Sequence, residues 1–173
     1  MLFTKSIVLP LAALASTVLA DGASIGAALD TINSDTLALE QSVSAWDGDF
    51  LGTLSIVALS AELLVAIKEG AKTAKASAAL DLGDAVTVAE KTITLAASVN
   101  GTITAIIAAK PKFDHLLISP VTLLNLDLEK SATDELSAAI VSKIPADLQP
   151  TAQTLVSGID DSFNEGIAAY KLF

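Results

Sequence analysis

Residues 25–46 read IGAALDTINSDTLALEQSVSAW, and apolar side chains recur along them in alternating steps of four and three. This heptad spacing places those side chains on one face of an α-helix. Thr36 fills one position of the series, so a hydroxyl is expected on the buried face. The Asp47-Gly48-Asp49 turn ends the pattern, and Asp49 is suited to cap the next helix. The face comprises Ile25, Leu29, Ile32, Thr36, Leu39, Val43 and Trp46.

Four more segments with a helical spacing of apolar residues follow this one. Lys110-Pro111-Lys112 is expected to end the third helix, because proline disrupts a helix interior. Ser119 is the expected N-cap of the fourth helix, with Pro120 at its first position, and Asp147 is the expected cap of the fifth. No segment alternates with the period of an exposed strand. The sequence therefore predicts an all-α protein, a single five-helix bundle with helices over residues 25–46, 50–79, 84–109, 119–144 and 147–170.

The first twenty residues have the pattern of a secretory signal peptide. Lys5 precedes an apolar run over residues 7–15, and small residues surround a cleavage site after Ala20. A retained membrane anchor is the alternative, but the run is too short to span a bilayer and Pro10 interrupts it. We therefore expect a leader over residues 1–20 and one bundle domain over residues 21–173. No later segment is expected to be transmembrane.

The composition excludes several classes of protein. The chain has ten lysines and no arginine against twenty acidic residues, a net charge of -10, so nucleic acid is not an expected partner. It has no cysteine and a single histidine, which removes disulfides, thiolate metal sites and cysteine nucleophiles. A Gly-x-Ser-x-Gly nucleophile motif is also missing. We expect no metal, no cofactor and no catalytic residue, and hence a protein that is not an enzyme.

The interior of the predicted bundle is aliphatic, because 52% of the chain is hydrophobic and only 4% is aromatic. Five long helices with few large side chains either pack tightly or leave an elongated apolar central cavity. Such a cavity would bind a chain-like apolar ligand. The residues expected to line it are Leu39, Val57, Leu64, Leu95, Val99, Leu124, Leu128, Ile140, Ile159 and Phe163.

The polar end of such a ligand would need hydroxyls, an amide or backbone donors, because there is no arginine to form a bidentate pair with it. The candidates are Thr36, Ser137 and Ser157. Ser137 and Ser157 are expected to lie level with each other across the hairpin that turns at Pro145. The alternative for each hydroxyl is a bond to the preceding turn of its own helix. Asn100 begins an Asn-Gly-Thr sequon and is a candidate glycosylation site.

The chain resembles the fungal hydrophobic-surface-binding protein A family, which includes the lipid-binding domains of cell-wall mannoproteins. The resemblance rests on a leader followed by an acidic, cysteine-free chain, on the Ile25…Leu29…Ile32…Leu39 series, on Lys110-Pro111-Lys112-Phe113, and on Phe163 with Ala168-Ala169-Tyr170. It covers essentially all of residues 21–173.

The resemblance implies a five-helix bundle that encloses an apolar tunnel for a long-chain fatty acid. The implied function is that of a secreted, non-catalytic carrier or scavenger of fatty acids or similar lipids. The alternative is an adhesion protein that coats hydrophobic surfaces and recruits a secreted hydrolase. The expected location is outside the cell, with association with the cell wall left open.

Overall fold

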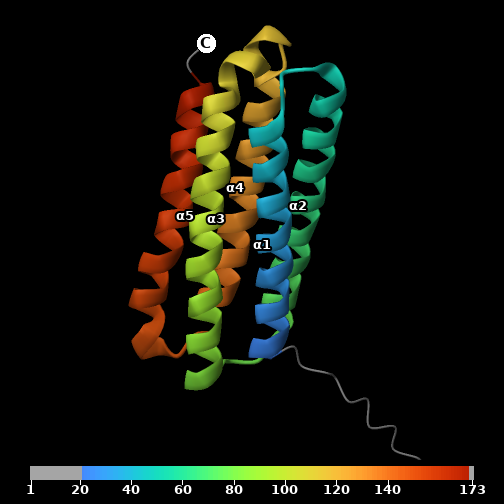
Figure 1. Cartoon of the computed structure of the whole chain (residues 1–173). Helices are drawn as coiled ribbons and strands as arrows, with labels where there is room; N and C mark the ends of the chain where they lie inside the picture. The colour runs from blue at the N-terminus through green and yellow to red at the C-terminus, as the bar shows by residue number, and fades with distance from the viewer. Residues whose placement is uncertain (1–20, 172–173) are drawn as a thin grey trace, which may run out of the picture.

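The computed structural model describes residues 21–171, and 1–20, the predicted leader, lie outside this range. Five long α-helices run side by side along one axis (Figure 1). None of the residues 21–171 lies in a strand, so the prediction of an all-α bundle is confirmed. The helices are α1 Gly22–Ala45, α2 Phe50–Ala76, α3 Leu82–His115, α4 Ser119–Val141 and α5 Gln149–Tyr170, with a short 3-10 helix η1 Ala146–Leu148 before α5.

Aspartate side chains begin the first three helices. Asp21, Asp49 and Asp81 have extended backbones and precede α1, α2 and α3. Each carboxylate accepts a hydrogen bond from the backbone N–H three residues later, at 3.1, 2.8 and 2.8 Å respectively. These bonds satisfy amide donors that have no partner within the helix. The sequence predicted the cap at Asp49, which is confirmed.

The helices form a closed ring. Going round it, α1 packs on α2, α2 on α4, α4 on α5, α5 on α3, and α3 returns to α1. No helix occupies the middle of this ring in the described part of the chain, so side chains from all five must fill the axis. The largest of the fully buried ones, apart from Tyr170, are branched aliphatic residues such as Ile25, Leu39 and Leu126.

Three aromatic residues close one end of the ring. The rings of Trp46 and Phe113 lie 4.6 Å apart between centroids, and those of Phe113 and Tyr170 lie 6.3 Å apart. The Tyr170 hydroxyl donates to the carbonyl of Ile106 at 2.8 Å, and the Trp46 indole N–H donates to the carbonyl of Asp49 at 2.8 Å. Both polar atoms of the cluster are therefore satisfied.

The expected end of the third helix at Pro111 is wrong, because α3 continues through Pro111 to His115. Proline removes one hydrogen bond from a helix interior and crowds the preceding turn. Packing outweighs that cost here. The additional turn carries Phe113, which is buried in the aromatic cluster, and the Lys110 ammonium bonds to Asp114 at 2.7 Å.

Two other predicted caps are also wrong. Ile118, not Ser119, is the N-cap of α4, and the Ser119 hydroxyl instead donates to the Asp114 carboxylate. Asp147 does not cap α5, because it lies in the middle of η1, and Leu148 precedes α5 without a side-chain cap. Pro120 lies in the first turn of α4, as expected, and Pro150 lies in the first turn of α5.

By length and composition, α2 and α3 are apolar enough to cross a membrane, although no transmembrane segment was expected after the leader. Both helices are walls of the ring, and each contributes buried side chains to the core. Helix α2 also has an apolar outer face, with Phe50, Leu51, Leu54, Val57 and Val65 exposed. Its high hydropathy therefore comes from two apolar faces, one buried and one on the surface.

Candidate functional site

Two apolar cavities lie inside the ring. The first, between α2 and α4, has a volume of about 60 Å³ and is called the α2–α4 cavity. The second, of about 20 Å³, lies between all five helices and is called the central cavity. Ile106 and Glu129 line both, so the two cavities adjoin. Their other walls include Leu39, Ile56, Val57, Phe113 and Leu126 in the first, and Ile32, Leu95, Val99, Ile159 and Phe163 in the second.

A larger hollow lies on the surface between α4 and α5. This α4–α5 groove has a volume of about 530 Å³ and is lined by Ser137, Val141, Val156 and Ser157, among others. Thr133 lines both the groove and the central cavity. The three hollows therefore follow one another along α4, from its first half to its last turns.

Polar side chains mark this path on α4. Glu129, Thr133 and Ser137 are spaced four residues apart, which puts them on one side of the helix. Glu129 lines the two interior cavities, Thr133 the central cavity and the groove, and Ser137 the groove. A line of polar groups thus runs from the inside of an aliphatic bundle to its surface.

Glu129 is the residue that the sequence analysis missed. Its side chain is buried, with only 4% of the residue exposed, and its Oε1 accepts a hydrogen bond from the Ser60 hydroxyl at 2.6 Å. Burial raises the pKa of this carboxyl to about 7, although the bond from Ser60 acts in the opposite direction. No other titratable side chain of the described residues lines either cavity. Near neutral pH the carboxyl is therefore present in both protonation states.

The three hydroxyl candidates have different surroundings. Thr36 is buried beside the central cavity, and its hydroxyl donates to the Ile32 carbonyl at 2.7 Å, the bond to its own preceding turn. Ser157 is exposed and donates in the same way to the Thr154 carbonyl at 2.8 Å. Ser137 is half-buried, and its hydroxyl bonds to none of the residues 21–171. Ser137 and Ser157 line the same groove, as residues level across a hairpin should.

Most of the expected lining residues lie in the interior. Leu39 and Val57 line the α2–α4 cavity, although Val57 is partly exposed at its mouth. Four others line the central cavity, namely Leu95, Val99, Ile159 and Phe163. Ile140 is buried in the core, and Leu64 is partly buried and packs against the core. Neither residue lines one of these two cavities.

The placement of Leu124 and Leu128 in the cavity wall is corrected by the structure. Leu124 is 56% exposed and Leu128 is 42% exposed. The buried face of α4 instead carries Leu126, Glu129, Thr133 and Leu136. Polar residues interrupt that face, so the sequence pattern favoured the more uniformly apolar series beside it. Hydrophobicity along α4 alone gave no signal for the true face, which the packing of α4 against α2 and α5 determines.

Exposed aliphatic side chains lie at the mouth of the α2–α4 cavity and beside it along α2 and α4. Val57 and Val121 line the cavity from α2 and α4 and are 41% and 47% exposed. Leu54 lies one turn before Val57, and Leu124 and Leu128 follow Val121 at helical spacing. All three are also exposed. We call these five residues the apolar rim.

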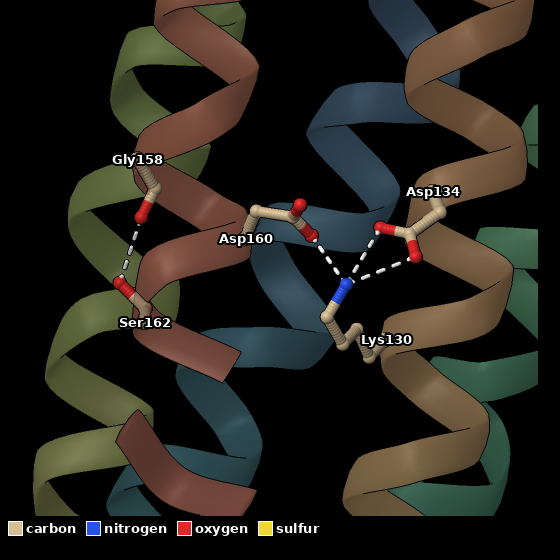
Figure 2. Close-up of polar contacts among 5 residues, drawn as sticks. All are labelled: Lys130, Asp134, Gly158, Asp160 and Ser162. Carbon is tan, nitrogen blue, oxygen red and sulfur yellow. Dashed lines mark hydrogen bonds and ion pairs between the residues drawn. The ribbon is translucent and has the colours of Figure 1, made fainter. Parts of the chain in front are cut away.

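Ionic groups lie beside the α4–α5 groove (Figure 2). The Lys130 ammonium on α4 donates to Asp160 on α5 at 2.7 Å and to Asp134 at 3.0 Å. The bond from Lys130 lowers the pKa of Asp160, whereas burial raises the pKa of Asp134. One cation therefore balances two acids, and the groove offers no surplus positive charge to a ligand carboxylate.

Asn100 lies on α3 opposite this part of α5. The residue is exposed, and its side-chain amide donates to the Ser162 hydroxyl at 3.4 Å. Ser162 in turn donates to the Gly158 carbonyl at 3.0 Å (Figure 2). Thr102, the third residue of the sequon, is buried and donates to the Ser98 and Thr36 carbonyls. Glycosylation of Asn100 stays a proposal. A glycan there would lie where α3 and α5 are in contact.

These features define a class: small all-α domains in which a ring of five helices surrounds an aliphatic and hollowed interior. The chain belongs to the hydrophobic surface binding protein A family, whose model matches residues 22–142. The family resemblance inferred from the sequence is therefore confirmed.

The curated relatives carry the name cell wall mannoprotein 1. The protein from Aspergillus flavus is 32% identical over 140 residues, which is 81% of this chain and 50% of the relative. The protein from Aspergillus fumigatus is 33% identical over 144 residues, 83% of this chain and 50% of the relative. The chain thus spans about half the length of the curated relatives it matches.

Solved structures share the fold. The crystal structure of Afmp4p in complex with palmitic acid superposes with a TM-score of 0.85 at 30% identity, over 87% of this chain and all of that one. Ligand binding domain 1 of the Penicillium marneffei MP1 protein, complexed with arachidonic acids, superposes with a TM-score of 0.83 over 87% of this chain and 99% of that one. At 17% identity the second likeness establishes the fold alone.

Proposed function

We propose that the chain is an exported, non-catalytic domain that binds a long-chain fatty acid or a similar lipid between its helices. The observation that carries this proposal is the pair of adjoining cavities inside the ring, walled mainly by aliphatic side chains. The likeness to Afmp4p, which was crystallised with palmitic acid, supports the same ligand class. The mannoprotein relatives support a location outside the cell or in its wall.

Binding would require the helices to separate. An apolar cavity of roughly 150 Å³ accommodates benzene, whereas the cavities here measure about 60 and 20 Å³. A long acyl chain would therefore join the two cavities by moving the side chains between them. Burying sixteen carbons contributes about 12 kcal/mol at about 0.8 kcal/mol per methylene. Roughly half of that would be lost to association and ordering, which leaves micromolar affinity or better.

We place the entry of a fatty acid at the α4–α5 groove, which its carboxyl end would meet first. Ser137 has a hydroxyl that bonds to none of the residues 21–171, and Ser157 lies on the opposite wall of the same groove. The acyl chain would pass Thr133 into the central cavity, which shares that residue with the groove. While it is in the groove, the carboxylate would keep contact with water, because its charge finds no unpaired cation there.

The direct test is lipid uptake by the purified chain after delipidation. Native mass spectrometry with palmitate is expected to give a one-to-one complex. Val99→Phe, which fills the central cavity, is expected to weaken uptake by more than about tenfold, because an enlarged side chain overpacks the path of the acyl chain.

Val65→Phe, the same change at a residue that is 60% exposed, is the matched control and should bind as the parent chain does. Circular dichroism would verify that both variants are folded. A delipidated chain that takes up no palmitate would refute the carrier function.

The apolar rim favours a second function, adsorption to hydrophobic surfaces. Its five aliphatic side chains are exposed to water, and contiguous exposed apolar patches mark interaction sites. The double variant Leu124→Ser/Leu128→Ser should adsorb less to alkyl-coated beads. Its palmitate uptake should be unchanged, because neither residue lines a cavity. Equal adsorption of variant and parent would show that the apolar rim is not the surface that adsorbs to the beads. Recruitment of a secreted hydrolase to the adsorbed protein is a further proposal, tested by co-sedimentation with the beads.

Export can be tested separately. Cleavage of the leader after Ala20 would give a secreted protein that begins at Asp21, the residue that caps α1. N-terminal sequencing of the protein from the medium of a secreting host reads this directly. An N-terminus inside α1, or a retained leader, would contradict the proposed site.

A further inference from the structure

Glu129 places an acid in the middle of an apolar path. Its carboxyl lines both interior cavities, and the Ser60 hydroxyl on α2 is its hydrogen-bond donor, at 2.6 Å. One accepted bond leaves the second carboxyl oxygen available to a ligand. A bundle that needed only to be apolar would carry leucine here, because a buried carboxyl is costly.

No acid or base of the other helices lines the two cavities beside Glu129 in the described part of the chain. The residues of α1, α2, α3 and α5 that line the two cavities include threonines and Ser60 but no acid and no base. Lys130, the next residue on α4, is directed to Asp134 and Asp160 beside the groove (Figure 2). An ionised ligand carboxylate that reached Glu129 would therefore meet a carboxyl group with no cation between them.

Two carboxyl groups in hydrogen-bond contact cannot both be ionised, and such a pair holds one proton between its oxygens. An alcohol has a different requirement. Its hydroxyl can donate to Glu129 whether the acid is protonated or ionised. The interior contact is therefore selective for headgroups that can form a hydrogen bond with Glu129, with one hydrogen between the two oxygen atoms.

We propose that Glu129, held by Ser60, is an interior headgroup contact that accepts lipid alcohols at any pH and fatty acids only together with one proton. This inference rests on the proposed lipid-binding function and refines it. The polar line of Ser137, Thr133 and Glu129 is the route by which a headgroup passes from the groove to the interior.

The proton balance sets the direction of the pH effect. Below a pKa of about 7, Glu129 carries the proton and donates it to the incoming carboxylate, so no proton is exchanged with water. Above that pH the glutamate is ionised, and the complex must take one proton from water. Fatty-acid affinity then falls by up to about tenfold per pH unit. Alcohol affinity stays nearly constant, because no proton is taken up.

The test compares dodecanoate with dodecanol, each displacing a fluorescent apolar probe from the full chain. Between about pH 6 and about pH 9 the affinity for dodecanoate should fall by about a hundredfold. The affinity for dodecanol should change by less than about twofold. Glu129→Gln should remove the pH dependence for dodecanoate, because its amide donates to a carboxylate at every pH. Glu165→Gln, the same change on the exposed face of α5, is the matched control and should retain it.

Ser60→Ala provides a second, independent variant. The bond from Ser60 lowers the pKa of Glu129, so its removal should move the loss of dodecanoate affinity to higher pH. An unchanged pH profile in both Glu129→Gln and Ser60→Ala would overturn the inference, with dodecanoate held in the groove instead. Failure of the parent chain to bind either lipid would overturn the proposed function itself.

Discussion

At the scale of single residues, Glu129 gives the stability of the fold an unusual pH dependence. Burial raises the pKa of its carboxyl from 4.5 to about 7, so the folded protein holds a proton that the unfolded chain releases. The contribution of this bound proton to the free energy of unfolding is complete below about pH 4.5 and is lost as the pH rises through about 7.

We expect this group to lower the free energy of unfolding by about 3 kcal/mol between pH 4.5 and pH 8. Urea denaturation of the parent chain and of Glu129→Gln at the two pH values measures it, since the variant lacks the titrating group. An identical pH dependence in both proteins would mean that Glu129 stays ionised inside the bundle.

The sequence predicted the buried polar position at Thr36 but not the one at Glu129. Thr36 stands in a series whose other members are large and apolar, so its heptad position is clear. Glu129 belongs to a face with Thr133, next to the more apolar series of Leu124 and Leu128. On a single helix those two faces are not distinguishable by hydrophobicity. Only the packing of α4 against α2 and α5 decides between them.

At the scale of secondary structure, Pro111 is the position where local preference and packing disagree. Its ring lies inside α3 and removes one backbone hydrogen bond. We expect Pro111→Ala to raise the free energy of unfolding by about 1–3 kcal/mol, because alanine restores the donor and relieves the crowding. Chemical denaturation gives the value. A loss of stability would indicate instead that the restricted backbone of proline in the unfolded chain matters more.

The helices themselves were largely predictable, and their ends were less so. The apolar periodicity, with the predicted cap at Asp49, placed the starts of α1, α2 and α3 to within a few residues. The continuation of α3 depends on Phe113 reaching Trp46 and Tyr170, which are distant in the sequence. A cap such as Ser119 was misplaced for a similar reason, since its hydroxyl bonds to Asp114 in the preceding helix. Contacts between elements, not local propensity, fix these ends.

At the scale of the whole molecule, the order of helices around the ring lay beyond the sequence pattern. Five amphipathic helices can surround an axis in several orders, and α4 crosses to lie between α2 and α5. The predicted interior was correct in its aliphatic character. The sizes of the cavities, about 60 and 20 Å³, depend on how those side chains interlock and could not be read from periodicity.

A ligand held between all five helices should stabilise the whole ring. At a palmitate concentration about a hundred times the Kd, binding raises the free energy of unfolding by about 2.7 kcal/mol. For a domain of this size that corresponds to a rise in Tm of roughly 5–10 °C. Differential scanning fluorimetry of the delipidated chain with and without palmitate measures it. An unchanged Tm under saturating ligand would show that the lipid does not enter the folded bundle.

The aromatic cluster contains the protein's own fluorophore. Trp46 is the single tryptophan of the chain, and it is buried against Phe113 at the end away from the α4–α5 groove. Phe113 also lines the α2–α4 cavity, so an acyl chain that filled both cavities would change the surroundings of the indole. Its fluorescence would then respond to loading as well as to melting, so the protein carries a natural optical probe of occupancy.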